Sequence, residues 1–192
     1  MAALLLVLPG SLTGQDQQPA LTADAGMVEV GGFAIDVYEF PNRLGAQPRV
    51  NVTWAEAAAA CAAQGKRLCT DREWREACAG PTGLLYGYGP VFAAGRCNTP
   101  FPVDGVWQRG QGTAAAGAFA ACTTPAGAHD MIGNVWEWTA DAYASGTDWH
   151  TVRGGSWFHN ANMATAEFRY GRYLTEEYRS DLVGFRCCRP LP

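Results

Sequence analysis

The segment RGGSWFHNANMATAEFRYGRY, residues 153–173, gathers side chains that could do chemistry or bind a partner. After two glycines it supplies His, Asn, Met, Glu, Arg and Tyr, with neither a helical nor a strand period. Irregular segments of this kind often carry function on a rigid scaffold. None of the seven cysteines falls within it. Three interpretations are open: an active site, a recognition surface, or neither.

A second chemical pattern is DMIGNVWEW, residues 130–138. Asp130 and Glu137 bracket a Gly-Asn turn, and backbone carbonyls lie between them. Hard oxygens from two carboxylates and the main chain are the ligands that Ca²⁺ prefers. Two acids at this spacing are, taken alone, more often solvated. Trp136 and Trp138, taken alone, are typical of core residues.

The cysteines predict disulfide bonds. None forms a C-x-x-C pair, and the chain has only 3 histidines, so a zinc site is poorly supported. Seven cysteines without metal spacing indicate disulfides formed in an oxidising compartment. Adjacent Cys187 and Cys188 rarely bond each other without strain, and in a strand they would point to opposite faces and reach different partners. Because the number is odd, one thiol should remain free.

Composition indicates one globular domain. The chain has 192 residues, of which 48% are hydrophobic and 17% charged, and its 23 glycines and 11 prolines predict many turns and ordered loops. The net charge is −4, and Lys66 is the single lysine. Without a basic stripe, no nucleic-acid partner is expected.

The N-terminal residues 1–25 begin with an apolar run from Ala2 to Leu8 and continue as a polar stretch. This run is too short to span a bilayer, so no transmembrane span is expected. It could be the remnant of a signal peptide that lacks the usual basic start, or a tail. The cysteines favour export, and therefore a secreted or periplasmic protein. We expect a signal remnant and linker over 1–25 and a folded domain over 26–190.

Local patterns predict an α+β domain with little regular secondary structure. Alternating apolar residues around Gly31-Gly32 predict a hairpin over 27–40. Thr53 and Glu56 form a capping box that opens a helix which Gly65 can close, and Thr70 and Glu73 open a second helix that ends at Gly80. Residues 81–127, rich in Gly, Ala and Pro, predict mostly ordered loop.

Four motifs in fixed order carry a resemblance to a known family. They are KRLCTDREW (66–74), DMIGNVWEW (130–138), RGGSW (153–157) and VGFRCC (183–188). Over roughly residues 27–189 the chain resembles the formylglycine-generating enzyme family, the sulfatase-modifying-factor domain. The resemblance implies that family's fold, a variant of the C-type-lectin-like fold with long ordered loops.

The resemblance also implies a structural calcium site and a set of disulfides. The matching calcium ligands are the side chains of Asp130 and Glu137 and the carbonyls of Gly133 and Val135. A second family calcium site would begin at Asn98, but its later ligands do not align clearly, so the sequence leaves that site unassigned. The family disulfide from the first helix to the GFRC strand matches Cys61 with Cys187.

A second family disulfide has no counterpart, because the partner of Cys78 is replaced by Phe168. Cys78 is therefore the candidate free thiol, buried and inert. The simplest remaining pairs are Cys69 with Cys188 and Cys97 with Cys122.

Active family members oxidise a cysteine of a sulfatase peptide with O₂ and Cu(I) held by two thiolates. The matching positions here are His159 and Ala164. Cu(I) prefers soft sulfur ligands, and alanine supplies none. A copper cofactor and the family's oxidase reaction are therefore not expected. Whether any enzymatic activity remains is left open, with the balance toward none.

The favoured function is a binding module whose ligand is a peptide, a protein or a glycan. Tyr, Asn and Arg side chains are typical of recognition surfaces. The candidate ligand-binding residues are Trp136, Ser156, Trp157, His159, Asn160, Asn162, Arg169, Tyr170, Arg172 and Tyr173, with Glu167 on the same rim. An equally weighted alternative is a solvated loop in which Arg169 and Arg172 pair with Glu167, Glu176 or Glu177. One version of the binding module is a displayed protein diversified over 153–189.

Two enzymatic alternatives remain. The first is altered chemistry in the periplasmic maturation of a secreted product, with candidate residues His159, Ser156, Glu167 and Arg169. The second is the family oxidase itself, with an unforeseen set of copper ligands. Sequence leaves the ligand and the oligomeric state undefined.

Overall fold

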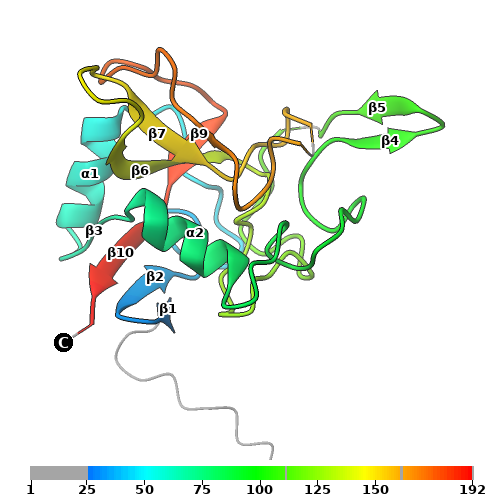
Figure 1. Ribbon diagram of the computed structural model, residues 1–192, viewed down its shortest axis with the longest axis horizontal. Coiled ribbons are helices and arrows are strands. Elements are labelled where there is room, and N and C mark those ends of the chain that lie inside the picture. Colours follow the sequence, from blue (N-terminus) through cyan, green and yellow to red (C-terminus); the bar gives the residue numbers. More distant parts are fainter. Residues whose placement is uncertain (1–25, 111, 161, 192) are drawn as a thin grey trace, which may run out of the picture.

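The structure, a computed structural model, describes residues 26–110, 112–160 and 162–191. Within these ranges the chain forms two helices and ten short strands joined by long ordered loops (Figure 1). The strands make two four-stranded sheets and one separate two-stranded sheet. This is the expected α+β fold with little regular secondary structure.

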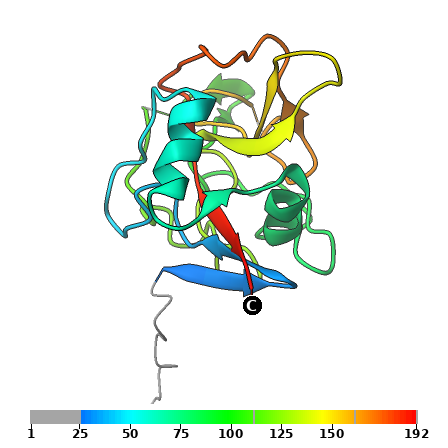
Figure 2. The same ribbon diagram turned by 90° about the vertical axis from the view of Figure 1, so that its left-hand side faces the viewer.

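The first four-stranded sheet joins the two ends of the described chain. Its order is β1 (Met27–Val30), β2 (Phe33–Asp36), β10 (Cys187–Pro190) and β3 (Arg67–Leu68). The β1–β2 hairpin is the one that the alternating pattern predicts. Strand β10 lies between β2 and β3, with Cys188 opposite Ile35 on one side and Arg67 on the other (Figure 2).

The second four-stranded sheet carries the chemically interesting segments. Its order is β8 (Arg169–Tyr170), β7 (His150–Arg153), β6 (Trp136–Ala142) and β9 (Val183–Phe185). Strands β6 and β9 are parallel, and the other pairs are antiparallel. The end of DMIGNVWEW therefore becomes an inner strand, beside the strand of the VGFRCC motif.

Both predicted helices are present and both begin with a capping box. In α1 (Trp54–Ala62) the Thr53 hydroxyl accepts from the N–H of Glu56, whose carboxylate accepts from the N–H of Thr53. Thr70 and Glu73 repeat the arrangement at α2 (Asp71–Ala79), which ends at Gly80 as expected. Each box satisfies two N–H groups that a helix start leaves unpaired.

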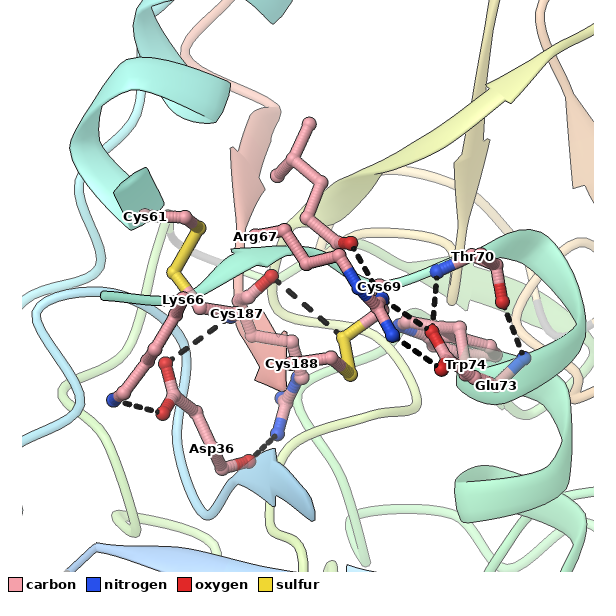
Figure 3. Close-up of a disulfide and its surroundings, with 12 residues drawn as sticks. Asp36, Cys61, Lys66, Arg67, Cys69, Thr70, Glu73, Trp74, Cys187 and Cys188 are labelled. Carbon is pink, nitrogen blue, oxygen red and sulfur yellow. Dashed lines mark hydrogen bonds and ion pairs between the residues drawn. A yellow bond between two sulfur atoms is a disulfide. The ribbon is translucent and has the colours of Figure 1, made fainter. Parts of the chain in front are cut away.

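Three disulfides hold these elements together. Cys61 of α1 bonds Cys187, and Cys69 bonds Cys188, so the adjacent cysteines of β10 reach different partners (Figure 3). Cys97 bonds Cys122 within the long loop region. These are the expected pairs, and Cys78, buried in α2, is the free thiol.

Residues 81–127 are mostly loop, as expected, apart from one hairpin that the sequence pattern did not indicate. It consists of β4 (Phe101–Val103) and β5 (Val106–Gln108). The hairpin extends away from the body of the domain (Figure 1). Its turn is Asp104-Gly105, with positive φ at both residues (49° and 78°), the combination that a two-residue hairpin turn favours.

The buried side chains form two clusters. One gathers around Trp74 of α2, and the other around Trp138 of β6 and Phe185 of β9. Neither helix of the described chain is long and apolar enough to cross a membrane.

Candidate functional site

A pocket of about 330 Å³ opens beside the second sheet, where β6 and β9 meet the chain that follows β7. The walls are mostly aromatic and aliphatic. The lining residues are Trp136, His159, Met163, Tyr170, Leu174, Tyr178, Leu182 and Val183. Trp136, Tyr170 and Val183 lie on strands of the sheet, whereas the other five come from the loop-rich chain 159–182. The pocket therefore combines a rigid floor with walls of irregular chain.

A short hydrogen-bond chain orients the one imidazole of the pocket. The indole Nε1 of Trp136 donates to Nδ1 of His159 across 3.0 Å, and the Ser156 Oγ lies 2.8 Å from the same nitrogen. An indole N–H can only donate, so Nδ1 must be the unprotonated acceptor. Burial lowers the pKa of His159, which favours the neutral ring. The neutral ring then carries its proton on Nε2, a donor left for a ligand.

The two positions that would supply copper thiolates hold His159 and Ala164. Ala164 is fully buried against Gly155, where an added Cβ would lie 2.7 Å from the Cα of Ala164. Six cysteines are in disulfides. Burial raises the pKa of the Cys78 thiol strongly, and Cys78 packs in the core cluster around Trp74, which also contains Ala164. The residues present do not fit a Cu(I) centre held by two thiolates.

The structure brings only some of the predicted ligand-binding residues to the pocket. Trp136, His159 and Tyr170 line it, and Ser156 lies behind His159, fully buried. Trp157 instead faces the base of the β4–β5 hairpin, where its carbonyl accepts from the N–H of Gly110.

The other predicted residues lie outside the pocket lining. Asn160 and Asn162 are exposed and bonded to each other, through the Asn160 Oδ1 and the Asn162 N–H. Arg172 donates to the hydroxyl of Tyr173, whose ring packs edge-on against Trp149 at 4.9 Å.

Five lining residues were missed by sequence reasoning: Met163, Leu174, Tyr178, Leu182 and Val183. Most of them are apolar, as core residues are, and Leu174 and Val183 are almost completely buried. The available signal was the recurrence of apolar residues through 163–183, just after the irregular polar segment. It does not distinguish a pocket wall from core.

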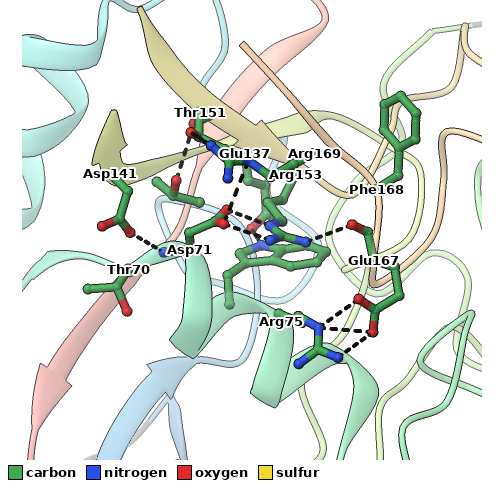
Figure 4. Close-up of polar contacts among 12 residues, drawn as sticks. Thr70, Asp71, Arg75, Glu137, Asp141, Thr151, Arg153, Glu167, Phe168 and Arg169 are labelled. Carbon is green, nitrogen blue, oxygen red and sulfur yellow. Dashed lines mark hydrogen bonds and ion pairs between the residues drawn. The ribbon is translucent and has the colours of Figure 1, made fainter. Parts of the chain in front are cut away.

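Arg169 lines a different, polar depression beside the start of α2, and Glu167 lies next to it, paired with Arg75 of that lining (Figure 4). There Arg153 makes a bidentate ion pair with Asp71, at 2.6 and 2.7 Å. Arg169 lies 3.8 Å from the same carboxylate and donates to the carbonyl of Tyr143. Glu167 pairs with Arg75 at 2.7 Å, rather than with Arg169 or Arg172. The four altered-enzyme candidates therefore fall into two separate places.

The proposed calcium ligands lie in a buried acidic cluster. Glu39, Asp130 and Glu137 are each at most 3% exposed, and Arg186 is the guanidinium among them. Burial, with Glu137 and Asp130 nearby, raises the pKa of Glu39 well above its usual range, and burial also raises the pKa of Asp130. Three carboxylates against one guanidinium leave an excess of negative charge that a divalent cation would balance.

Asp130 and Glu137 offer the oxygen donors that calcium prefers, but no three His, Cys, Asp or Glu side chains of the described residues are arranged to hold a metal ion, and Glu137 is also engaged elsewhere. Its Oε2 accepts from Trp74 and Arg186, whereas its Oε1 accepts one hydrogen bond, from Arg186. A carboxylate oxygen has two lone pairs, so Oε1 retains one. Asp130 and Gly133 have φ of 59° and 82°, an irregular backbone of the kind that can turn carbonyls toward an ion.

The fold and this site define a class: a disulfide-bonded, loop-rich α+β domain with a pocket beside a four-stranded sheet. Residues 41–191 match the family model described as the sulfatase-modifying factor enzyme 1-like domain. The chain therefore belongs to the formylglycine-generating enzyme family.

Among curated relatives, the chain is similar to the Bos taurus protein named inactive C-alpha-formylglycine-generating enzyme 2, with 38% identity over 151 residues. This match covers 73% of the chain and 49% of the relative, so the chain spans about half the length of that protein. Among solved structures, CarF has a TM-score of 0.66 at 19% identity, covering 87% of this chain and 96% of CarF. PvdO from Pseudomonas aeruginosa has a TM-score of 0.64 at 21% identity, covering 83% and 80%. These likenesses establish the shared fold.

Proposed function

We propose that this chain is a non-oxidase member of its family and acts as a binding module. The observation that carries the proposal is the identity of the two residues at the positions where active family members hold copper with thiolates. A neutral imidazole tied to Trp136 and Ser156 replaces one thiolate, and the buried methyl of Ala164 replaces the other. The match to a relative named as inactive supports the same conclusion.

The pocket and its surroundings support recognition of a peptide, protein or glycan. The lining combines aromatic rings, aliphatic side chains and a few polar tips, which is the composition of ordinary ligand pockets. Tyr170 and Tyr173 remain exposed nearby, at 39% and 62%. Exposed tyrosines are common at recognition surfaces, because the ring supplies contact area and the hydroxyl a hydrogen bond.

The proposal also includes export of the protein and a structural calcium ion. Three disulfides are typical of an extracellular or lumenal compartment, and we place the protein outside the cytosol as a secreted or periplasmic protein. Calcium would be held by the side chains of Asp130 and Glu137 and the carbonyls of Gly133 and Val135. Its role there is structural, because it would neutralise the buried acidic cluster that Glu39 completes.

One contact favours the alternative of altered enzymatic chemistry. Ser156 Oγ and His159 Nδ1 are 2.8 Å apart, the reach of a hydroxyl nucleophile and its base. Ser156 is, however, fully buried, so a substrate could not reach its oxygen without rearrangement. Glu167 and Arg169 do not line the same pocket. Binding therefore remains the better supported function, with the family oxidase last.

The copper affinity of two matched proteins tests the proposal. The wild-type chain is compared with the double variant His159→Cys/Ala164→Cys, which restores two thiols at the family positions. We expect competition with a Cu(I) chelator to show tight binding by the variant and none by the wild-type protein, because soft sulfur ligands hold Cu(I). One tightly bound copper per wild-type chain would contradict the proposal. Thermal unfolding of both proteins serves as the control for folding.

A further inference from the structure

We infer that the pocket beside β6 takes an uncharged aromatic side chain of a partner polypeptide, with a peptide carbonyl of that partner accepting from Nε2 of His159. The inference rests on the proposed binding function and names its ligand class. It depends on three properties of the lining: its charge, its aromatic content and its single oriented imidazole.

The lining offers no counterion. Its eight residues include neither an acidic side chain nor a lysine or arginine. The one imidazole, His159, is held neutral by its contacts, since protonation of Nδ1 would bring a second N–H toward the N–H of Trp136. A charged group brought into such a pocket loses water without gaining an opposite charge, which is costly. The ligand group is therefore uncharged.

Three rings and a thioether favour an aromatic guest. Trp136 and Tyr170 are tilted by 41° at 6.5 Å, and Tyr178 is held edge-on against Trp138 at 6.2 Å. Such pairs have preferred geometries, so these walls are positioned before a ligand arrives. The sulfur of Met163 adds a group that contacts aromatic rings favourably. The volume of about 330 Å³ admits a side chain and its adjoining peptide groups.

The imidazole adds one directed donor. Because Nδ1 is turned toward Trp136 and Ser156, Nε2 is the nitrogen that remains for a ligand. A peptide carbonyl next to an aromatic residue is a matching acceptor. A sugar would need several polar partners for its hydroxyls, and the lining supplies only the tips of His159, Tyr170 and Tyr178.

The probe is N-acetyl-L-phenylalaninamide, titrated into the whole protein while the NMR signal of the Trp136 indole N–H is followed. We expect saturable binding in the millimolar range or tighter, with a shift of that signal, as befits one anchored side chain. Three control probes should each bind about tenfold more weakly or not at all: N-acetyl-L-argininamide, the α-amide of N-acetyl-L-glutamate with its side-chain carboxylate free, and methyl α-glucoside. Equal or stronger binding of a charged probe or of the glucoside would overturn the inference, as would no binding of the aromatic probe.

Two pairs of variants locate the binding. Met163→Trp fills the pocket and should abolish binding of the aromatic probe. The control Val91→Trp adds the same ring at a position that is 73% exposed and outside the lining, and it should leave binding unchanged. His159→Phe removes the donor and should weaken binding about threefold to tenfold, and His159→Gln, which keeps an acceptor and a donor, should restore part of it. Unchanged affinity in Met163→Trp would overturn the inference.

The two proposals can fail separately. Copper affinity tests the non-oxidase function and does not depend on the aromatic probe. If the wild-type chain binds no copper and also ignores the aromatic probe, the non-oxidase assignment stands and the ligand class is wrong. If it binds both copper and the probe, the ligand class stands and the non-oxidase assignment falls.

Discussion

Trp136 and His159 are joined by a hydrogen bond of 3.0 Å from the indole N–H to Nδ1, between an inner strand of the second sheet and the loop that follows β7. The bond fixes the tautomer of the imidazole and, through it, the polar character of the pocket. Ser156 approaches the same nitrogen from within the loop. The pocket therefore has a defined donor where the family oxidase would need a thiolate.

This relationship predicts the pH response of His159. Burial lowers its pKa in the folded state, so the unfolded chain binds its proton first as the pH falls. The contribution to stability is complete above the ordinary value of about 6.5 and is lost as the pH drops from there toward the folded pKa. NMR titration of the ring should give a midpoint below about 6.5. A midpoint at or above that value would contradict the preference for the neutral ring.

The same loss should appear in stability measurements. Between about pH 7 and pH 5 the wild-type protein should lose more stability than His159→Gln, which cannot titrate. Comparing the two proteins isolates the imidazole, because Asp36, Glu39 and Asp130 have raised pKa values in both and act in the opposite direction. Parallel stability curves for the two proteins would show that His159 contributes nothing to the pH dependence.

Calcium should stabilise the protein through the acidic cluster. At a concentration 100 times its dissociation constant, a ligand that binds only the folded state adds about 2.7 kcal/mol to the free energy of unfolding. The thermal midpoint should therefore rise with Ca²⁺ and fall again with a chelator. Asp130→Asn should remove most of this increment, whereas Asp148→Asn, an exposed acid in the β6–β7 connection, should keep it. An identical increment in Asp130→Asn would refute the assignment of this ligand.

Arg186 and Glu137 form a fully buried pair that should be costly to break. The side chains are 0% and 1% exposed and are 2.7 Å apart, and Glu39 and Asp130 stand close to the same guanidinium. Arg186→Met would leave three buried carboxylates without their cation and should cost about 3–5 kcal/mol of stability or prevent folding. Arg67→Met, which breaks a partly exposed pair with Glu73, should cost about 1 kcal/mol or less. Denaturant unfolding of both variants provides the comparison, and equal losses would contradict the special role of the buried pair.

The thiol content should distinguish Cys78 from the other cysteines. Burial raises the pKa of its thiol, and the reactive species is the thiolate. A thiol reagent should therefore find no reactive group in the native protein and one per chain after unfolding without reductant. Cys78→Ser should leave none in either state. Fast reaction of the native protein would mean that Cys78 is accessible.

The parts of the fold that depend on local signals were predictable from sequence. Two capping boxes located α1 and α2, and a period of two located the β1–β2 hairpin. Family resemblance gave the Cys61–Cys187 pair and the free thiol, and the other two pairs were the simplest that remained; spacing alone permits other connectivities. The β4–β5 hairpin was missed, since its strands are short and contain Pro102, although Asp104-Gly105 was a usable turn signal.

The site was harder to predict, because its members are brought together by long loops. Sequence reasoning found His159 and Trp136 by their place in family motifs but could not show that they touch. It grouped Glu167 and Arg169 with His159 because they are close in sequence. In the structure, ion pairs with α2 hold Arg169 in the lining of the polar depression and Glu167 beside it. Leu174 and Tyr178 were not singled out from the sequence, and only the folded chain shows that they face a cavity.

The most direct test of the non-oxidase assignment is oxygen consumption by the purified full chain, loaded with Cu(I) and given a cysteine-containing sulfatase peptide. A formylglycine-generating enzyme with both thiolates, assayed in parallel, shows that the peptide and the copper are competent. For the chain with His159 and Ala164 we predict no copper-dependent oxygen consumption and no aldehyde product. Copper-dependent turnover of the peptide would contradict the account and make this protein an oxidase with a different set of copper ligands.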